Sequence, residues 1–290
     1  MIHAGVELGG TKCVAILARD PTDVLARETI ATTVPDETLA YLERILAEWK
    51  RVHDFDALGF ASFGPLDLDR ASTTYGHILT TPKLGWSHVD VLSPFIPLGV
   101  PRAFDTDVNG AALAEMRWGS GRGFDDFAYV TVGTGVGVGL IVNGRPTRGF
   151  AHCELGHIRV ARLPNDDWPG SCPYHRDCIE GLASGSSLKA RFGHDLGRLP
   201  TDHPVWESVS WSLAQLCHAI VAAGAPRRIA IGGGVMERQP HLLAKIQSKL
   251  ETSLNGFTQL PRDGDYVRSP ELGSDAGPMG AIALAMTAIA

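Results

Sequence analysis

The first third of the chain alternates between two patterns of apolar and polar residues. Short apolar runs at 5–10, 12–18 and 57–63 have the composition of buried β-strands, and the first two flank a glycine turn. Residues 36–52 have helical spacing instead, with Asp36 placed as an N-cap. The apolar positions of that helix are Leu39, Leu42, Ile45, Leu46, Trp49 and Val52. The pattern therefore predicts strands and helices that alternate.

The middle of the chain repeats this order of elements. Residues 127–144, FAYVTVGTGVGVGLIVNG, predict a strand, a glycine turn and a second strand, as at the beginning of the chain. Two such hairpins, about half a chain apart, suggest a duplicated α/β unit. Further on, the pattern predicts a helix over 206–224, a strand running into a glycine turn over 227–235, and closing helices over 240–254 and 277–290.

Composition and charge narrow the class of protein. The 290 residues suffice for one large domain or two lobes, and 44% hydrophobic with 20% charged residues is ordinary for a globular protein. The net charge of -6 argues against a nucleic-acid partner that needs a basic surface. No targeting segment and no apolar run long enough to cross a bilayer stand out. Five scattered cysteines suggest no disulfide framework, so we expect a cytoplasmic protein with reduced thiols.

Residues 143–185 lack any clear periodicity, and within them lies a cluster of potential metal ligands. Cys172, His175 and Cys178 form a C-x2-H-x2-C pattern, whose thiolates and imidazole favour zinc. A bound metal would fix a loop of this length, which is otherwise uncommon in a compact domain. The alternative is that these are polar loop residues without a metal.

A tetrahedral zinc site needs a fourth ligand. We choose His157, with His152 and Cys153 as competitors in the same short segment. Four protein ligands close the coordination sphere, so this zinc would be structural and would not activate a water. A zinc-bound imidazole still has a second nitrogen that can donate to a substrate.

Three glycine-rich turns each follow a predicted strand. Such turns can bring backbone N–H groups close to an anion, although glycines also serve simply to make tight hairpins. None of them fits the Walker A or G-x-G-x-x-G signatures. The candidate anion-binding residues are Gly9, Gly10, Thr11, Lys12, Gly133, Thr134, Gly135, Gly232, Gly233 and Gly234.

A candidate base lies where another strand meets a helix. Residues 103–115 read as a strand followed by a helix that begins near Asn109. Asp107 could accept a proton from an alcohol. The alternative is that Asp105 or Asp107 merely caps the helix.

Taken together, these segments resemble the ROK family of sugar kinases along nearly the whole chain. ELGGTK and GTGVGVGLIVNG resemble the two phosphate-binding hairpins, and IAIGGGV resembles the adenosine-side loop. TDVNGAA resembles the segment of the catalytic aspartate, and HCELGHI with CPYHRDCIEGLASG resembles the sugar-and-zinc segment. Glu7, TPKLGW and the C-x2-H-x2-C pattern are similar to the bacterial fructokinase branch, although Leu84 and Cys153 stand where that branch often has proline.

The resemblance implies two actin-like lobes of ribonuclease H-like topology, with a cleft between them and a zinc-pinned loop. The N-terminal lobe would span 1–110 and be completed by 277–290, and the C-terminal lobe would span 111–276 with the zinc loop at 152–180. It also implies that the protein phosphorylates a hexose with ATP and Mg²⁺, most simply fructose to fructose 6-phosphate, with Asp107 as general base and Glu7 as an outer-sphere partner of Mg²⁺. The sugar ligands would be Asn109, Glu154, His157 and Glu180.

Other functions fit parts of the sequence. Within the family, a glucokinase or a broad hexokinase that also accepts mannose is the alternative. A zinc-stabilised sugar sensor would have lost the base or a phosphate turn, and a zinc-ribbon module would lack the large α/β scaffold. We expect no N-terminal helix-turn-helix domain, because ELGGTK begins at residue 7. The expected partners are a sugar, a nucleotide and a second copy in a homodimer, with no nucleic acid and no membrane.

Overall fold

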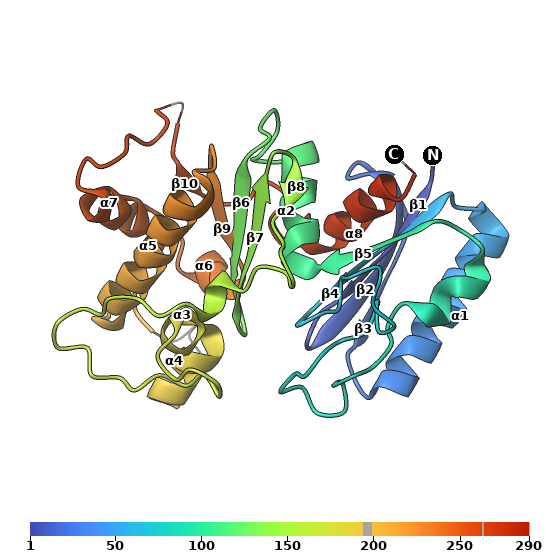
Figure 1. Cartoon of the computed structure of the whole chain (residues 1–290), viewed down its shortest axis with the longest axis horizontal. Helices are drawn as coiled ribbons and strands as arrows, with labels where there is room; N and C mark the ends of the chain where they lie inside the picture. The colour runs from blue at the N-terminus through green and yellow to red at the C-terminus, as the bar shows by residue number, and fades with distance from the viewer. Residues whose placement is uncertain (194–198, 263, 290) are drawn as a thin grey trace. The chain divides into compact units, whose positions relative to one another are not determined.

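The computed structural model describes residues 1–193, 199–262 and 264–289 and divides into two compact units. Unit 1 comprises residues 1–122, 147–152 and 274–290, and unit 2 comprises residues 123–146 and 153–273. Each unit is built around its own five-stranded sheet, labelled β1–β5 and β6–β10 in Figure 1.

The sheet of unit 1 has the strand order β3-β2-β1-β4-β5. β1 pairs antiparallel with β2, which pairs antiparallel with β3, whereas β4 and β5 continue the sheet in parallel with β1. The strands are β1 His3–Leu8, β2 Lys12–Asp20, β3 Asp23–Ala31, β4 Ala57–Ser62 and β5 Arg102–Thr106. The sequence pattern did not predict β3, whose side chains are mostly exposed and do not alternate between apolar and polar.

The sheet of unit 2 repeats this topology. Its order is β10-β9-β6-β7-β8, and each pairing has the direction of its counterpart in unit 1. The strands are β6 Phe127–Val132, β7 Val136–Val142, β8 Arg145–Pro146, β9 Ile229–Gly232 and β10 Val267–Arg268. The predicted α/β class and the duplicated unit are both confirmed.

Helices cover both faces of the first sheet. α1 lies on one face, and α2 and α8 lie on the other (Figure 1). They span α1 Pro35–His53, α2 Asp107–Trp118 and α8 Ala276–Thr287, and the short helix η1 spans Ser93–Leu98. α8 approaches β4 so closely that a Cβ at Gly59 would lie 1.8 Å from the Ala281 carbonyl oxygen, which explains that glycine.

The predicted cap of α1 is wrong in detail. The N-cap residue is Val34, which makes no side-chain capping bond, and Pro35 opens the helix. Asp36 lies in the first turn, where its negative charge interacts favourably with the positive end of the helix dipole.

Unit 2 buries its core between the second sheet and a layer of helices in which α5 packs against α7 (Figure 1). The predicted apolar positions Trp206, Val209, Leu213, Leu216 and Ile220 of α5 are all buried. The helices are η2 Leu155–His157, α3 Ile179–Ala183, α4 Gly185–Phe192, α5 Val205–Gly224, α6 Gly234–Arg238 and α7 Leu242–Leu254, followed by η4 Gly273–Asp275. Within the described ranges, no helix is both long and apolar enough to cross a membrane.

Candidate functional site

The first glycine turn joins β1 to β2. It is closed by a bond of 3.0 Å from the Gly9 amide to the Lys12 carbonyl. The N–H groups of Gly10 and Thr11 have no acceptor among the described residues, and both residues are exposed. Lys12 is the exposed first residue of β2. The turn can therefore offer two backbone donors to an anion.

Two aspartates lie at the corner between β5 and α2, and their hydrogen bonds differ. Asp105 is 2% exposed, and both of its oxygens are occupied. Its Oδ1 accepts from Asn109 Nδ2 at 2.7 Å and from the Thr106 amide at 2.8 Å, and its Oδ2 is paired with Arg148. The N-cap of α2 is Thr106, which accepts from the Asn109 amide at 3.2 Å. Neither aspartate is the cap, and Asp105 is committed to structure.

Asp107 is the first residue of α2, so the helix begins two residues before the predicted start. Its Oδ1 accepts from the Val108 amide at 2.8 Å, and its Oδ2 accepts no bond from the described residues. Burial raises the pKa of Asp107 to about 6. A carboxylate with one free oxygen and a pKa close to neutral suits proton transfer.

Asn109 is buried directly after this corner, on the first turn of α2. Its Nδ2 donates to Asp105, whereas its Oδ1 has no hydrogen-bond partner among the described residues. A buried acceptor without a partner is costly. Asn109 is therefore suited to accept a bond from a ligand hydroxyl.

Glu7 lies at the end of β1, beside the first turn of α8. A Cβ at Gly277 would come within 2.1 Å of its Oε1, so Glu7 would have to move if that residue had a side chain. Burial, and next the charge of Asp107, raises the pKa of Glu7 to about 7. A nearby divalent cation would lower both pKa values, and oxygen donors of this kind fit Mg²⁺.

The second glycine turn joins β6 to β7 and is braced by the beginning of α4. The Gly185 amide donates to the Gly133 carbonyl at 2.7 Å, and the Ser186 amide donates to the Thr134 carbonyl at 3.4 Å. The Gly133 amide donates to the Gly135 carbonyl at 2.9 Å. The bracing donors therefore belong to the backbone.

Glu180 contacts this same turn. Its Oε2 accepts from the Val136 amide at 3.2 Å, and a Cβ at Gly135 would lie 2.4 Å from that oxygen. The structure thus places a predicted sugar ligand against the second glycine turn, with Oε1 as its second acceptor oxygen.

The third turn follows β9, which is the parallel neighbour of β6. Gly233 has φ +90°, and a Cβ there would lie 2.7 Å from the Val132 amide nitrogen, so a side chain is excluded. α6 begins at Gly234. Since parallel strands end at the same edge of a sheet, Gly232–Gly234 lies beside the second turn.

The Cys and His residues of the irregular segment lie together, with their ligand atoms within 4.8 Å of one another. His157 Nδ1 lies 3.7 Å from Cys172 Sγ and 3.6 Å from Cys178 Sγ, and His175 Nδ1 lies 3.9 Å from Cys172 Sγ. With Zn–S of about 2.3 Å and Zn–N of about 2.1 Å, a tetrahedral site has S···N separations of about 3.6 Å. The four side chains fit a zinc ion.

The competing ligands are placed elsewhere. His152 Nε2 accepts from the Leu66 amide at 2.9 Å, in unit 1. Cys153 is half-buried and lies outside the cluster. Glu154 is exposed, and its carbonyl accepts from the His157 amide at 3.0 Å, which places it one helical turn from the cluster.

Thr32 and Lys83 contact the first turn from outside it, and the sequence did not predict either contact. The Thr32 hydroxyl donates to the Gly9 carbonyl at 2.7 Å, and Lys83 Nζ donates to the Gly10 carbonyl at 2.6 Å. TPKLGW was noted for its likeness to one branch of the family, and this likeness was the available signal for Lys83.

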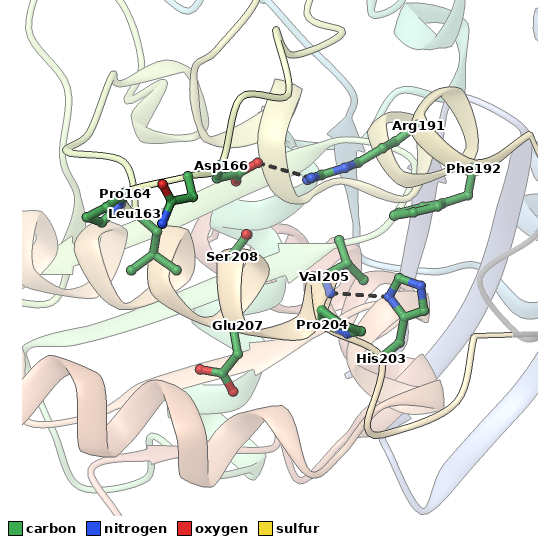
Figure 2. A pocket seen from close by; sticks show the side chains of 11 residues that line it. Leu163, Pro164, Asp166, Arg191, Phe192, His203, Pro204, Val205, Glu207 and Ser208 are labelled. Carbon is green, nitrogen blue, oxygen red and sulfur yellow. Dashed lines mark hydrogen bonds and ion pairs between the residues drawn. The ribbon is translucent and has the colours of Figure 1, made fainter.

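A cavity of about 350 Å³ in unit 2 lies apart from these groups. Figure 2 shows Arg191 and Asp166 pointing toward one another beside it, 3.1 Å apart, and His203 accepting from the Val205 amide. None of the residues predicted for the site lines it. The lining residues are Leu163, Pro164, Asn165, Asp166, Arg191, Phe192, His203, Pro204, Val205, Glu207 and Ser208.

The duplicated α/β frame carries glycine turns, an aspartate corner and a Cys/His cluster, which is the arrangement expected of the sugar kinases that the sequence resembles. The chain belongs to the ROK family, whose model matches residues 3–288. It is 39% identical to a putative fructokinase of Bacillus subtilis (strain 168), covering 98% of this chain and 95% of the relative. It is 40% identical to a fructokinase of Zymomonas mobilis, covering 99% and 97%. The crystal structure of a ROK hexokinase from Thermus thermophilus superposes with a TM-score of 0.79 at 25% identity, covering 100% of this chain and 99% of that chain.

Proposed function

We propose that this protein is a fructokinase that transfers the γ-phosphoryl group of ATP to the 6-hydroxyl of fructose. The observation that carries the proposal is the full-length similarity to fructokinases at 39% and 40% identity. The sites of the two units support it, because they supply a base, anion-binding turns and acceptors for hydroxyl groups.

Asp107 is the proposed general base. As the sugar oxygen bonds to the γ-phosphorus, ADP leaves and the hydroxyl proton passes to the free Oδ2 of Asp107. The raised pKa, about 6, keeps this carboxylate mostly ionised at neutral pH and still basic enough to accept a proton. The bond from the Val108 amide fixes the orientation of the carboxylate.

The glycine turns are the proposed phosphate sites. The amides of Gly10 and Thr11 in the turn at 9–12, and amides of the turn at 133–135 other than that of Gly133, would donate to phosphate oxygens. Residues 232–234 would approach the adenosine side. Mg²⁺ would neutralise phosphate charge, with Glu7 as a partner through water. The chemistry is mostly positioning, since the transition state of phosphoryl transfer is loose.

Four residues are the proposed sugar ligands. Asn109 would accept through Oδ1, and Glu154 and Glu180 would accept from hydroxyl groups through their carboxylates. His157 would bind zinc through Nδ1, the atom that faces both cysteine sulfurs, and donate through Nε2. A site with this many acceptors would reject sugars that lack a hydroxyl.

The proposed role of zinc is to hold the irregular segment in place as a structural ion. His157, Cys172, His175 and Cys178 would hold it, and Cys178 is followed directly by α3 and Glu180. Zinc would thus fix Glu180 without taking part in the reaction.

A homodimer in the cytoplasm, with sugar and nucleotide as its small-molecule partners, completes the proposal. The mass of the purified protein by light scattering tests the dimer, for which about twice 31.0 kDa is expected.

Activity on a panel of sugars tests the function. With MgATP held constant, kcat/KM should be highest for fructose, followed by mannose and glucose, and the product should be fructose 6-phosphate. A preference for glucose would make the protein a glucokinase, and similar values for all three would make it a broad hexokinase. Sugar binding without any turnover would make it a sugar sensor.

A further inference from the structure

Three successive carbonyl groups of the first glycine turn each accept a hydrogen bond from a residue outside the turn. The Thr32 hydroxyl donates to Gly9 O at 2.7 Å, Lys83 Nζ donates to Gly10 O at 2.6 Å, and the Thr32 amide donates to Thr11 O at 3.0 Å. Two of these three donors are side chains. The turn is therefore fixed by groups outside its own hairpin.

Fixing the carbonyls also aims the amides. In a trans peptide the C=O of one residue points opposite to the N–H of the next. Holding Gly9 O and Gly10 O on one side therefore directs the N–H groups of Gly10 and Thr11 to the other side. Those are the two N–H groups that have no acceptor among the described residues.

Lys83 reaches the turn from a loop 73 positions further along the chain. The loop is docked by Trp86, which is fully buried and donates from Nε1 to the Thr33 carbonyl at 2.9 Å. Lys83 Nζ also lies 3.5 Å from the Thr32 carbonyl and 6.0 Å from the Trp86 ring. The half-buried ammonium group thus has a defined position behind the turn.

We propose that Lys83 is a positioning residue for the nucleotide, which orients the Gly10–Thr11 peptide so that the Thr11 amide faces a phosphate oxygen of ATP. This inference rests on the proposed function. A charged donor holds a carbonyl more firmly than a neutral one does. It also polarises the peptide, which makes the N–H on the opposite side a better donor.

Two other roles for Lys83 give different results. If its ammonium group contacted phosphate directly, it would act independently of Thr32. If it contacted the sugar, its loss would raise the KM for fructose. Only a positioning role couples Lys83 to Thr32 and acts on the nucleotide alone.

Lys83→Met tests the inference because it keeps the length of the side chain and removes the donor. Loss of one charge-assisted hydrogen bond should raise the KM for ATP about tenfold, with a smaller change in kcat and less than a twofold change in the KM for fructose. Lys83→Arg should restore most of the affinity for ATP. Lys249→Met is the matched control, since Lys249 is a partly buried lysine paired with Glu207 in unit 2, and its KM for ATP should not change.

The double variant Lys83→Met/Thr32→Val tests the coupling. Because both side chains hold one turn, its rise in the KM for ATP should be clearly less than the product of the two single rises. Melting temperatures verify the fold of each variant, and Lys83→Gln replaces Lys83→Met if the latter does not fold. An unchanged KM for ATP, equal rises for ATP and fructose, or independent effects in the double variant would overturn the inference. If the wild-type protein phosphorylates no hexose, it is the proposed function that fails instead.

Discussion

The first and second glycine turns occupy equivalent places in two sheets of the same topology, but they are braced in different ways. The first is held by the side chains of Thr32 and Lys83 together with the Thr32 amide, whereas the second is held by the backbone amides of Gly185 and Ser186 alone. A single substitution can remove a side-chain donor. A backbone donor can be disturbed only through the helix that carries it, so the two turns should respond to different changes.

The residues that hold the second turn follow the Cys/His cluster closely in the sequence. Cys178 precedes α3, Ser184 caps α4 by accepting from the Ser187 amide at 3.1 Å, and Gly185 and Ser186 then hold the turn. We therefore expect the metal to support the second turn, whereas the first turn depends on unit 1 alone.

Replacing Asp107, the proposed base, should lower activity more than any change to the turns. Asp107→Asn should lower kcat about 10²–10⁴-fold, because the proton acceptor is lost while both turns remain. Binding of ADP and of fructose, measured by calorimetry, should stay within a few-fold of wild type. Asp105→Asn is an informative comparison, because it disturbs the anchor of Asn109 and Arg148 and should lower thermal stability as well. Near-normal turnover in Asp107→Asn would remove Asp107 from its role.

Removal of zinc should disturb unit 2 and spare the first turn. In a chelated protein we expect kcat/KM for fructose to fall roughly 100-fold, because a displacement of about 1 Å at the site has an effect of this size. Hydrogen exchange should increase over residues 153–192 and not over residues 3–20.

The matched pair for this experiment is Cys172→Ser and Cys153→Ser. The first should lose zinc and activity, and the second should keep both, because Cys153 lies outside the cluster. Full activity in protein verified to be free of zinc would contradict this role of zinc.

A methyl group on the second turn should break its contact with Glu180. In Gly135→Ala the new Cβ would lie 2.4 Å from Glu180 Oε2, so the glutamate or the turn must move. We expect kcat/KM to fall about 10- to 100-fold, with higher KM values for both ATP and fructose. Gly149→Ala, outside both turns, is the control for steric bulk, since a Cβ there meets nothing within 4 Å. Equal effects of the two substitutions would mean that the contact between Gly135 and Glu180 does not matter for activity.

Loss of the neutral donor behind the first turn should have the smallest effect. Thr32→Val removes one hydrogen bond, worth about 1 kcal/mol, and should raise the KM for ATP about fivefold. Thr32→Ser keeps the hydroxyl and should behave like wild type. If the valine variant binds ATP as wild type does, the Gly9 carbonyl does not need this donor.

The sequence predicted the parts of the fold and site that have strong local patterns. The apolar runs of β1, β2, β4, β6 and β7 and the periodicity of α1 and α5 could be recognised because burial is regular there. The C-x2-H-x2-C pattern with His157 predicted four residues that do lie together.

The braces of the first turn could not be predicted in this way. β3 exposes Val24 and Leu25 and lacks an apolar period, so the strand that delivers Thr32 gave no signal. Lys83 meets Gly10 only through long-range folding, and no spacing rule relates two residues 73 positions apart. Likewise, spacing alone does not distinguish the aspartates at 105 and 107. The family resemblance selected Asp107 as the base, and the hydrogen bonds of the folded corner show that Asp105 is an anchor.

The pH dependence of kcat/KM for fructose tests the central claim, that Asp107 accepts the proton in phosphoryl transfer, most directly. Because burial raises the pKa of Asp107 to about 6, kcat/KM should fall tenfold per pH unit below about pH 6 and level off above it. Glu7 titrates nearby, with a pKa of about 7. The fall in kcat/KM at low pH should therefore persist in Glu7→Gln and vanish in Asp107→Asn. Bound Mg²⁺ would shift this fall to lower pH without removing it. A fall in kcat/KM that survives in Asp107→Asn would contradict the account.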